Sequence, residues 1–408
     1  MGIRWITPLL GTAPASSIDG ETDITVVDVR NLVDKAGNPI DVVREKIREG
    51  AKSLVQGKRT VVCCDYGMSR SNAVAAGVLA KFDNIGFDAA LRQVLDATGE
   101  KEIKLGPIGA VRAALGESAA QKDRRSQRSV LVTGGNGFLG KAFRLTAGDK
   151  FDLSAPARSE VDISLGSTQL GLLAIEEQVD CIVHLANPRV HTSNVALGQS
   201  LTMLRNVIDV CLSSDIKLIY PSGWEVYSGY SGALTADEST PPLPKGPYGE
   251  AKYLAELLIE HCRKTEGLRC LMLRSAAVYG AGGDKPKFIY SFIDKALRTD
   301  TIFTHHYSNG EPSLDLLYVD DFVAALVSAL ESDFLGDLNV GTGQLTSTKE
   351  IAQMIAKKLG SSSPIEPVLI DSNVASVAFD WRQAGEVLDW RPCLSIEDGL
   401  NRILSDIS

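Results

Sequence analysis

Short apolar runs alternate with amphipathic stretches along most of the chain, and this alternation predicts strands followed by helices. In the second part of the chain the apolar runs are Val130–Val132, Phe151–Ala155, Asp180–Leu185 and Ile216–Tyr220. Helical spacing occurs between them, as in Leu197–Leu212, and a further helix is predicted from Tyr248 to about His261. Strands and helices that alternate at this pitch indicate a doubly wound parallel sheet of the α/β class.

The first hundred residues show the same alternation over shorter distances. Ile24–Val29 and Arg59–Cys64 are predicted to be buried strands, with a helix at Val42–Gln56 between them. The small apolar residues of Asn72–Phe82 predict a buried helix, and the polar segment Ala113–Arg128 predicts a helix end and an exposed linker. We therefore expect a smaller α/β domain over residues 1–116, a linker over 117–128 and a larger domain over 129–408.

Length and composition narrow the class of protein. The chain has 408 residues, which favours two or three domains, and 44% of them are hydrophobic. The net charge of −9 and the lack of a long basic run argue against nucleic-acid binding. No leader segment or membrane span is predicted. Seven cysteines without metal-ligand spacing predict reduced thiols, no metal site and a cytoplasmic location, and a homodimer is left open.

The segment Thr133–Gly140, TGGNGFLG, lies between the apolar run at Val130–Val132 and a predicted helix. A strand, a tight glycine turn and a helix N-terminus together form an anion site that suits a pyrophosphate. Gly134 allows the turn, Gly137 permits close approach of the backbone, and Gly140 lets the helix pack against the strand. The turn therefore predicts dinucleotide binding, and a glycine-rich turn without a ligand is the alternative.

The residues that follow the predicted strands determine which dinucleotide fits. An acid at the end of the second strand would bind a ribose 2′-hydroxyl and favour NAD, but Ser154 to Arg158 contain no acid. Arg158 can contact a 2′-phosphate, so the cofactor is NAD or NADP with a weak preference for NADP; a plain surface arginine is the alternative. The expected cofactor contacts are Gly134, Asn136, Gly137, Phe138, Leu139, Gly140, Arg158, Asp162, Ile163, Leu185, Ala186 and Lys252.

Tyr248 and Lys252 stand four residues apart, on one face of a predicted helix. The ammonium of Lys252 would lower the pKa of the Tyr248 phenol, so that the phenol exchanges a proton near neutral pH. A surface pair is the alternative interpretation of this spacing. Ser222, after the fourth strand, offers a hydroxyl for a substrate carbonyl beside the phenol, and Gly223 follows it.

These segments resemble the extended short-chain dehydrogenase/reductase superfamily, near its NAD-dependent epimerase/dehydratase branch. The resemblance covers about residues 128–406 and rests on TGGNGFLG, HLAN, WEVY, YGEAK, LRSAAVYG, LLYVDDFVAAL and LNVGTG, in the family's order. It implies a Rossmann core and a small C-terminal substrate lobe, mainly from about residue 275, that includes Asn339–Gly343 and Asp380–Pro392. It also implies a hydride-transfer enzyme with Tyr248 as catalytic acid/base and Lys252 as its partner.

Two departures from the family's pattern bear on the substrate. Gly223 replaces a usual Ser or Thr, so Ser222 is expected to supply the catalytic hydroxyl, and Ala277 stands where nucleotide-sugar epimerases often have Asn. A sugar nucleotide is the leading substrate, with epimerisation, dehydration or reduction as the reaction. One alternative is an NADPH-dependent ketone or aldehyde reductase with a non-catalytic phosphate-binding module. The other is a non-enzymatic, dinucleotide-sensing regulatory protein.

The segment Cys64–Ser71, CDYGMSRS, lies between a predicted strand and a predicted helix. The five residues between Cys64 and Arg70 can turn their N–H groups around a phosphate, and the helix N-terminus adds positive potential. The same field favours a nucleophilic thiolate at Cys64, while Arg70 can hold a phosphoryl group with two hydrogen bonds. Ser71 can donate a hydrogen bond to the thiolate when it leaves.

This segment resembles the cysteine-dependent dual-specificity and tyrosine phosphatases, over about residues 20–115. The resemblance implies hydrolysis of a phosphoester with Cys64 as nucleophile and Arg70 as phosphoryl ligand. Asp34 is the first choice for the general acid, ahead of Asp28. Cys63 replaces the histidine that usually precedes the nucleophile, and a domain that binds phosphate or a partner without hydrolysis is the alternative.

Overall fold

The computed structural model describes residues 2–18, 20–117, 127–188, 192–283 and 287–405. These residues cluster into two compact units. The first unit holds residues 1–128, 158–179 and 205–216, and the second holds residues 129–157, 180–204 and 217–408. Most of the linker expected at 117–128 lies outside the described residues, so its boundaries stay a prediction.

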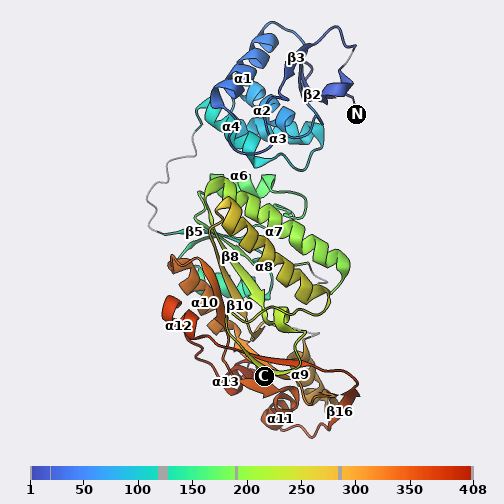
Figure 1. The fold of residues 1–408 in the computed structure, drawn as a ribbon, viewed down its shortest axis with the longest axis vertical. Helices are drawn as coiled ribbons and strands as arrows, with labels where there is room; N and C mark the ends of the chain where they lie inside the picture. The colour runs from blue at the N-terminus through green and yellow to red at the C-terminus, as the bar shows by residue number, and fades with distance from the viewer. Residues whose placement is uncertain (1, 19, 118–126, 189–191, 284–286, 406–408) are drawn as a thin grey trace. The chain divides into compact units, whose positions relative to one another are not determined.

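A four-stranded sheet forms part of the first unit (Figure 1). Its strands are β1 (Arg4–Trp5), β2 (Leu10–Pro14), β3 (Thr25–Asp28) and β4 (Thr60–Cys64), in the order β1-β2-β4-β3. Strands β2, β3 and β4 are parallel, so their carboxyl ends meet at one edge of the sheet. The strands predicted near β3 and β4 are confirmed. Strand β2 was missed because its sequence, LGTAP, carries the Gly and Pro that usually mark turns.

Four helices accompany this sheet: α1 (Ile40–Val55), α2 (Arg70–Asp83), α3 (Phe87–Thr98) and α4 (Leu105–Leu115). Helix α2 contacts α1, α3 and α4 as well as strands β2 and β4, and it is buried from Arg70 to Ala80. Its small residues allow this close packing on several sides. The buried helix expected over residues 72–82 is thus confirmed, and it begins two residues earlier, directly after the loop that follows β4.

A six-stranded parallel sheet organises the second unit (Figure 1). Its order is β14-β10-β8-β7-β5-β6, and the strands are β5 (Ser129–Thr133), β6 (Asp152–Ser154), β7 (Cys181–His184), β8 (Lys217–Gly223), β10 (Cys270–Ser275) and β14 (Gly336–Val340). The helices between these strands in sequence are α5 (Phe138–Ala147), α6 (Thr168–Glu176), α7 (Asn194–Ser214), α8 (Gly246–Glu266) and α10 (Val319–Glu331). Of these, α6 and residues 205–214 of α7 are assigned to the first unit. The predicted doubly wound parallel sheet is confirmed. The strand order changes direction at β5, and such a point forms a crevice at the carboxyl ends of the strands.

The remaining elements form the small lobe and its connections. The strands are β9 (Gly232–Ala236), β11 (Ala277–Tyr279), β12 (Ile302–Tyr307), β13 (Ser313–Tyr318), β15 (Leu345–Ser347), β16 (Ile365–Ile370) and β17 (Ala375–Phe379). The helices are α9 (Phe288–Arg298), α11 (Thr348–Leu359), α12 (Arg382–Leu388) and α13 (Ile396–Ser405), with short 3-10 turns η1 (Ala15–Ser17) and η2 (Trp224–Tyr227). One expectation is corrected. Asn339 was assigned to the lobe, but it lies in β14, which hydrogen-bonds to β10 and so belongs to the core sheet.

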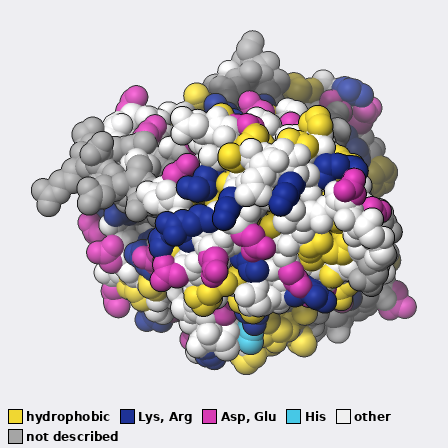
Figure 2. Space-filling view, turned by 90° about the horizontal axis from the view of Figure 1, so that it is seen from above, with side chains coloured by type: hydrophobic (Ala, Val, Ile, Leu, Met, Phe, Trp, Pro, Cys, Tyr) yellow, Lys and Arg dark blue, Asp and Glu magenta, His cyan; other side chains and the backbone are white. Residues whose placement is uncertain are grey.

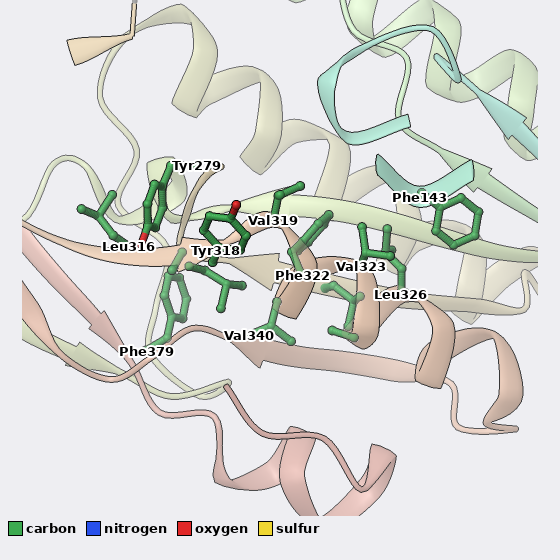
Figure 3. Close-up of a cluster of buried hydrophobic side chains, with 14 of the residues drawn as sticks. Phe143, Tyr279, Leu316, Tyr318, Val319, Phe322, Val323, Leu326, Val340 and Phe379 are labelled. Carbon is green, nitrogen blue, oxygen red and sulfur yellow. The ribbon is translucent and has the colours of Figure 1, made fainter. Parts of the chain in front are cut away.

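A large apolar cluster joins the sheet of the second unit to its small lobe (Figure 3). Phe322 from α10 and Phe379 from β17 are fully buried in it, and Phe143 joins it from α5. Tyr279 and Tyr318 meet edge to face, with ring centroids 5.4 Å apart. Aromatic side chains bury large areas and favour this geometry, so the cluster fixes the lobe on the core sheet.

Helix α7 is the one helix, among the residues described, that is long and apolar enough to cross a membrane by length and composition. Its side chains Leu204, Val207 and Ile208 are buried inside the fold, and a core helix meets the same criterion. The surface charge is mixed: on the face in Figure 2, Lys and Arg side chains are interspersed with Asp and Glu. On that face the charged side chains are therefore not gathered into one field of a single sign.

Candidate functional site

In the glycine turn after β5, backbone atoms lie so close together that side chains would not fit. Gly134 has φ +75°, and a Cβ added there would lie 2.6 Å from the Ala186 nitrogen. A Cβ at Gly140 would lie 2.4 Å from the Gly134 oxygen. Gly137 precedes α5 without a side-chain cap, so the first N–H groups of the helix are left for a ligand. This cradle fits the pyrophosphate of a dinucleotide, as its sequence predicted.

A cavity of about 670 Å³ opens beside this turn, entirely within the second unit. The carboxyl ends of β7 and β8, the start of α8 and the start of α9 complete its wall. Ten of the predicted site residues line it, namely Gly134, Gly137, Phe138, Leu139, Gly140, Leu185, Ala186, Ser222, Tyr248 and Lys252. The sheet thus brings together side chains that lie more than a hundred residues apart in sequence, and the volume suits a nucleotide-sized ligand.

Four predicted cofactor contacts do not line this cavity. Asn136 accepts a hydrogen bond from Arg144 Nη1 at 3.3 Å on the outside of the turn. Arg158 Nε donates to Asp162 Oδ2 at 3.0 Å, and the Ile163 carbonyl accepts from the Asn206 amide at 2.8 Å. Arg158, Asp162 and Ile163 belong to the first unit, whereas the cavity lies within the second unit. Their roles in cofactor binding therefore stay predictions.

Tyr248 and Lys252 lie in the first turns of α8, half-buried at the cavity wall. Lys252 Nζ donates to the Pro221 carbonyl at 2.8 Å and lies 5.9 Å from the centroid of the Tyr248 ring. The surroundings of the phenol oppose the lowered pKa that its spacing from Lys252 predicted. Burial raises the pKa of Tyr248, and the nearby Glu225 carboxylate raises it further. The pKa of Lys252 is lowered by burial, against the pull of Glu225 and Glu256.

Glu225 is a cavity residue to which sequence reasoning gave no role. It lies on η2, half-buried, and burial raises the pKa of its carboxyl, while the ammonium groups of Lys252 and Lys287 act in the opposite direction. Lys287 also lies over the Phe138 ring of the glycine turn, with Nζ 4.8 Å from the ring centroid. An acid inside the otherwise apolar segment WEVY was the available signal for this residue.

Ser222 is held by a buried ion pair beneath the cavity. Its hydroxyl donates to Glu256 Oε1 at 2.5 Å. Arg274 Nη2 donates to Glu256 Oε2 at 2.9 Å, and both charged side chains are almost completely buried. Glu256 stands one turn after Lys252 on α8, so this face of the helix carries a phenol, an ammonium and a carboxylate in succession.

His184 closes the floor of the cavity and stays neutral. Its Nδ1 lies 2.7 Å from Thr133 Oγ1, and its ring stacks on Tyr220 with centroids 6.0 Å apart. Burial and the charge of Lys252 lower the pKa of His184 to about 3. The ring therefore contributes shape and a hydrogen bond, and no charge, at neutral pH.

A second constellation lies in the first unit, at the end of β4. The Gly67 N–H donates to Cys64 Sγ at 3.2 Å, and the Cys64 thiol lies 3.4 Å from Ser71 Oγ. Arg70 Nη1 donates to the Leu32 carbonyl at 3.0 Å, and Arg70 Nε lies 3.4 Å from Asp34 Oδ2. The structure thus brings together Cys64, Arg70 and Ser71, as the spacing of CDYGMSRS predicted, and places Asp34, the first choice for the general acid, beside Arg70.

The second choice for a general acid is engaged elsewhere. Asp28 pairs with Arg30, with Oδ2 and Nη2 2.7 Å apart, and this hydrogen bond holds the pKa of the Asp28 carboxyl below its usual range. Cys63, which replaces the usual histidine, is a buried free thiol. Burial and the Asp28 charge raise its pKa to about 11, so Cys63 stays protonated and only Cys64 faces Ser71.

Comparisons with known proteins agree with the second unit's geometry. A model of the NAD dependent epimerase/dehydratase family matches residues 130–341. The chain is 27% identical over 303 residues to a putative UDP-glucose 4-epimerase of Methanocaldococcus jannaschii, covering 68% of this chain and 97% of that protein. It is 26% identical over 318 residues to dTDP-4-dehydro-6-deoxyglucose reductase of Escherichia coli, covering 69% of this chain and 98% of that protein.

Solved structures share the fold. The UDP-glucose 4-epimerase of Thermus thermophilus, in complex with NAD, has a TM-score of 0.61 at 21% identity. That match covers 68% of this chain and 98% of the epimerase. The family match begins at residue 130 and does not extend to the constellation around Cys64.

Gly140→Ala is expected to abolish dinucleotide binding, because the new methyl group would displace the Gly134 carbonyl and distort the cradle. Calorimetric titration with NADH and NADPH measures this. The control is Gly198→Ala on α7, where an added Cβ meets nothing within 4 Å. Unchanged affinity in Gly140→Ala would contradict the assignment of the turn. In the wild-type protein, an NADH preference of about tenfold or more, about 1.4 kcal/mol, would contradict the role given to Arg158.

Proposed function

Because the chain belongs to the NAD dependent epimerase/dehydratase family, we propose that its second domain is an NAD(P)-dependent enzyme acting on a sugar nucleotide. The observation that carries the proposal is the single cavity wall shared by the glycine cradle, Tyr248 and Lys252. It supports hydride transfer next to proton transfer at one substrate carbon. A regulator that only senses a dinucleotide would not need the phenol and the ammonium at that wall.

The chain's own residues supply binding and proton transfer. The cradle of Gly134, Gly137 and Gly140 would hold the dinucleotide, whose nicotinamide supplies hydride acceptor and donor chemistry when bound. Tyr248 takes a proton from a substrate hydroxyl, or returns one to a carbonyl oxygen. Lys252 is fixed by the Pro221 carbonyl, so its charge can stabilise the phenolate as the proton leaves.

Glu225 supports dehydration among the three candidate reactions. Burial raises the pKa of its carboxyl toward the range of a group that exchanges protons, while the ammonium groups of Lys252 and Lys287 favour the charged form. When water is lost beside a ketone, a proton must leave the carbon next to the ketone. A second acid/base group, in addition to Tyr248, is needed to accept that proton. Epimerisation and reduction can proceed with the phenol alone.

The preference for NADP remains part of the proposal and depends on Arg158. Its guanidinium is highly exposed, which suits contact with a 2′-phosphate, but Asp162 and Ser164 already accept hydrogen bonds from it. A 2′-phosphate would therefore compete with Asp162 for this side chain. The proposed location is the cytoplasm, supported by seven cysteines that form no disulfide in the described structure.

The first unit is proposed to be a cysteine-dependent phosphatase that acts on a phosphomonoester. The grouping of Cys64, Arg70 and Asp34 around one loop supports this proposal. Attack of the Cys64 thiolate on phosphorus would form the S–P bond of a thiophosphate ester and break the P–O bond to the leaving group, whose oxygen Asp34 protonates to give the alcohol. Water would then hydrolyse the thiophosphate to inorganic phosphate and regenerate the thiol.

Tyr248→Phe is expected to lower turnover of a sugar nucleotide by about 10²–10⁴, because only the acid/base oxygen is lost. Cofactor affinity should change only a few-fold. Mass spectrometry of the product distinguishes the reactions, since an epimer keeps the substrate's mass, dehydration removes water and reduction adds hydrogen. The control is Tyr253→Phe, which alters a phenol on the same helix outside the lining residues of the cavity. Full activity in Tyr248→Phe would refute the mechanism.

Ser222→Ala separates two roles for the hydroxyl. Because its proton is donated to Glu256, we expect the variant to lose about 1–3 kcal/mol of unfolding free energy, as a buried acceptor is left with one partner fewer. Turnover should fall less than about tenfold. Urea denaturation and steady-state kinetics measure the two effects. A larger loss of turnover with unchanged stability would instead place Ser222 at the substrate carbonyl, as its sequence position suggested.

Cys64→Ser is expected to abolish hydrolysis of an aryl phosphate while phosphate binding persists, since the loop N–H groups and Arg70 remain. The control is Cys63→Ser, which changes the neighbouring thiol that lies outside the constellation. Hydrolysis is followed by release of the phenol and binding by calorimetry. If the wild-type protein hydrolyses no more than Cys64→Ser over a range of phosphomonoesters, the first unit is a binding domain.

A further inference from the structure

The guanidinium of Arg70, the cation of the proposed phosphatase site, is already held by the protein's own groups. Its Nη1 faces inward and donates to the carbonyls of Leu32 and Arg30, at 3.0 and 3.4 Å. Its Nη2 donates to Asp65 Oδ2 at 2.6 Å. Its Nε is buried and makes no hydrogen bond in the described structure, with Asp34 Oδ2 at 3.4 Å as an ion-pair neighbour.

The pair Nε and Nη2 is the edge of a guanidinium that can take an oxyanion with two parallel hydrogen bonds. In this structure that edge is turned toward carboxylates. Asp65 therefore satisfies the donor that a phosphoryl oxygen would use, and its negative charge lies where a second anion would have to enter.

The two partners differ in their freedom to move. The Arg70 side chain is only 11% exposed and is anchored by backbone carbonyls, whereas the Asp65 side chain is 52% exposed. Asp65 also stands directly after Cys64, at the start of the loop. When the ion pair opens, Asp65 can turn into water while Arg70 stays in place.

We propose that Asp65 is an internal competitor for the anion site, which sets its affinity for phosphate and selects against ligands with additional negative charge. This inference rests on the proposed phosphatase site. It gives the substrate class as a phosphomonoester whose alcohol part carries no further phosphate. The exposed Tyr66 and Met68 in the same loop offer apolar contact to such an alcohol.

Asp65→Asn tests the proposal, because it removes the charge and keeps the size of the side chain. Calorimetry with inorganic phosphate and with pyrophosphate on the full chain is the measurement. We expect phosphate affinity to rise about tenfold and pyrophosphate affinity to rise more, since the latter carries more charge. Asp83→Asn removes the same charge at the far end of α2, about 20 Å away along the helix, and should change neither affinity more than twofold.

The outcomes separate the inference from the function on which it rests. If the wild-type protein binds phosphate, Arg70→Lys weakens that binding and Asp65→Asn does not strengthen it, then the role of Asp65 is wrong and the anion site stands. If phosphate binds neither the wild-type protein nor Asp65→Asn, or if Arg70→Lys has no effect, then the anion site at Cys64 is wrong and the inference falls with it.

Discussion

The cavity of the second unit depends on the burial of one positive charge, the ammonium of Lys252. Removing an ammonium group from water costs several kcal/mol unless oppositely charged or polar groups replace the water. The Pro221 carbonyl provides a hydrogen bond at 2.8 Å, and the carboxylates of Glu225 and Glu256 oppose the loss of its proton. Glu256 is in turn paired with Arg274, so the charge of Lys252 is supported by a network that spans α8, β8 and β10. That network also holds the Ser222 hydroxyl, which lines the same cavity.

Parallel strands explain why these groups meet. Side chains and loops that follow parallel strands collect at the carboxyl edge of a sheet, whatever their distance in sequence. The glycine turn follows β5, Leu185 and Ala186 follow β7, and η2 follows β8. In the first unit the loop of Cys64 follows β4, and Arg30 and Asp34 lie after the parallel strand β3. Each sheet thus places a candidate site at its carboxyl edge, and the two candidate sites differ in their side chains.

Much of the fold followed from apolar periodicity, because most predicted strands are buried on both faces and read as continuous apolar runs. Strands with turn-like residues, such as β2, and the short strands of the lobe gave no such run. The residues that line the cavity could be predicted where they belong to a local sequence motif, as in the glycine turn and in the four-residue spacing of Tyr248 and Lys252. Glu225 was not predictable in its role, because its surroundings come from η2, α8 and α9 together. The raised pKa of Tyr248 was not predicted either, because it depends on the burial of the phenol, and the spacing of residues along a helix does not determine burial.

Both candidate sites place a carboxylate near a cation, but in different surroundings. Glu225 lines the cavity near Lys252, so the charge of each group shifts the proton equilibrium of the other. Asp65 is half exposed, so its bond to Arg70 is exchangeable with water and with other anions. In the proposed functions, the carboxylate at the cavity would tune the acidity of the reacting groups, whereas Asp65 would influence which ligand Arg70 accepts. Solvent exposure, more than the identity of the charged residues, decides between the two roles.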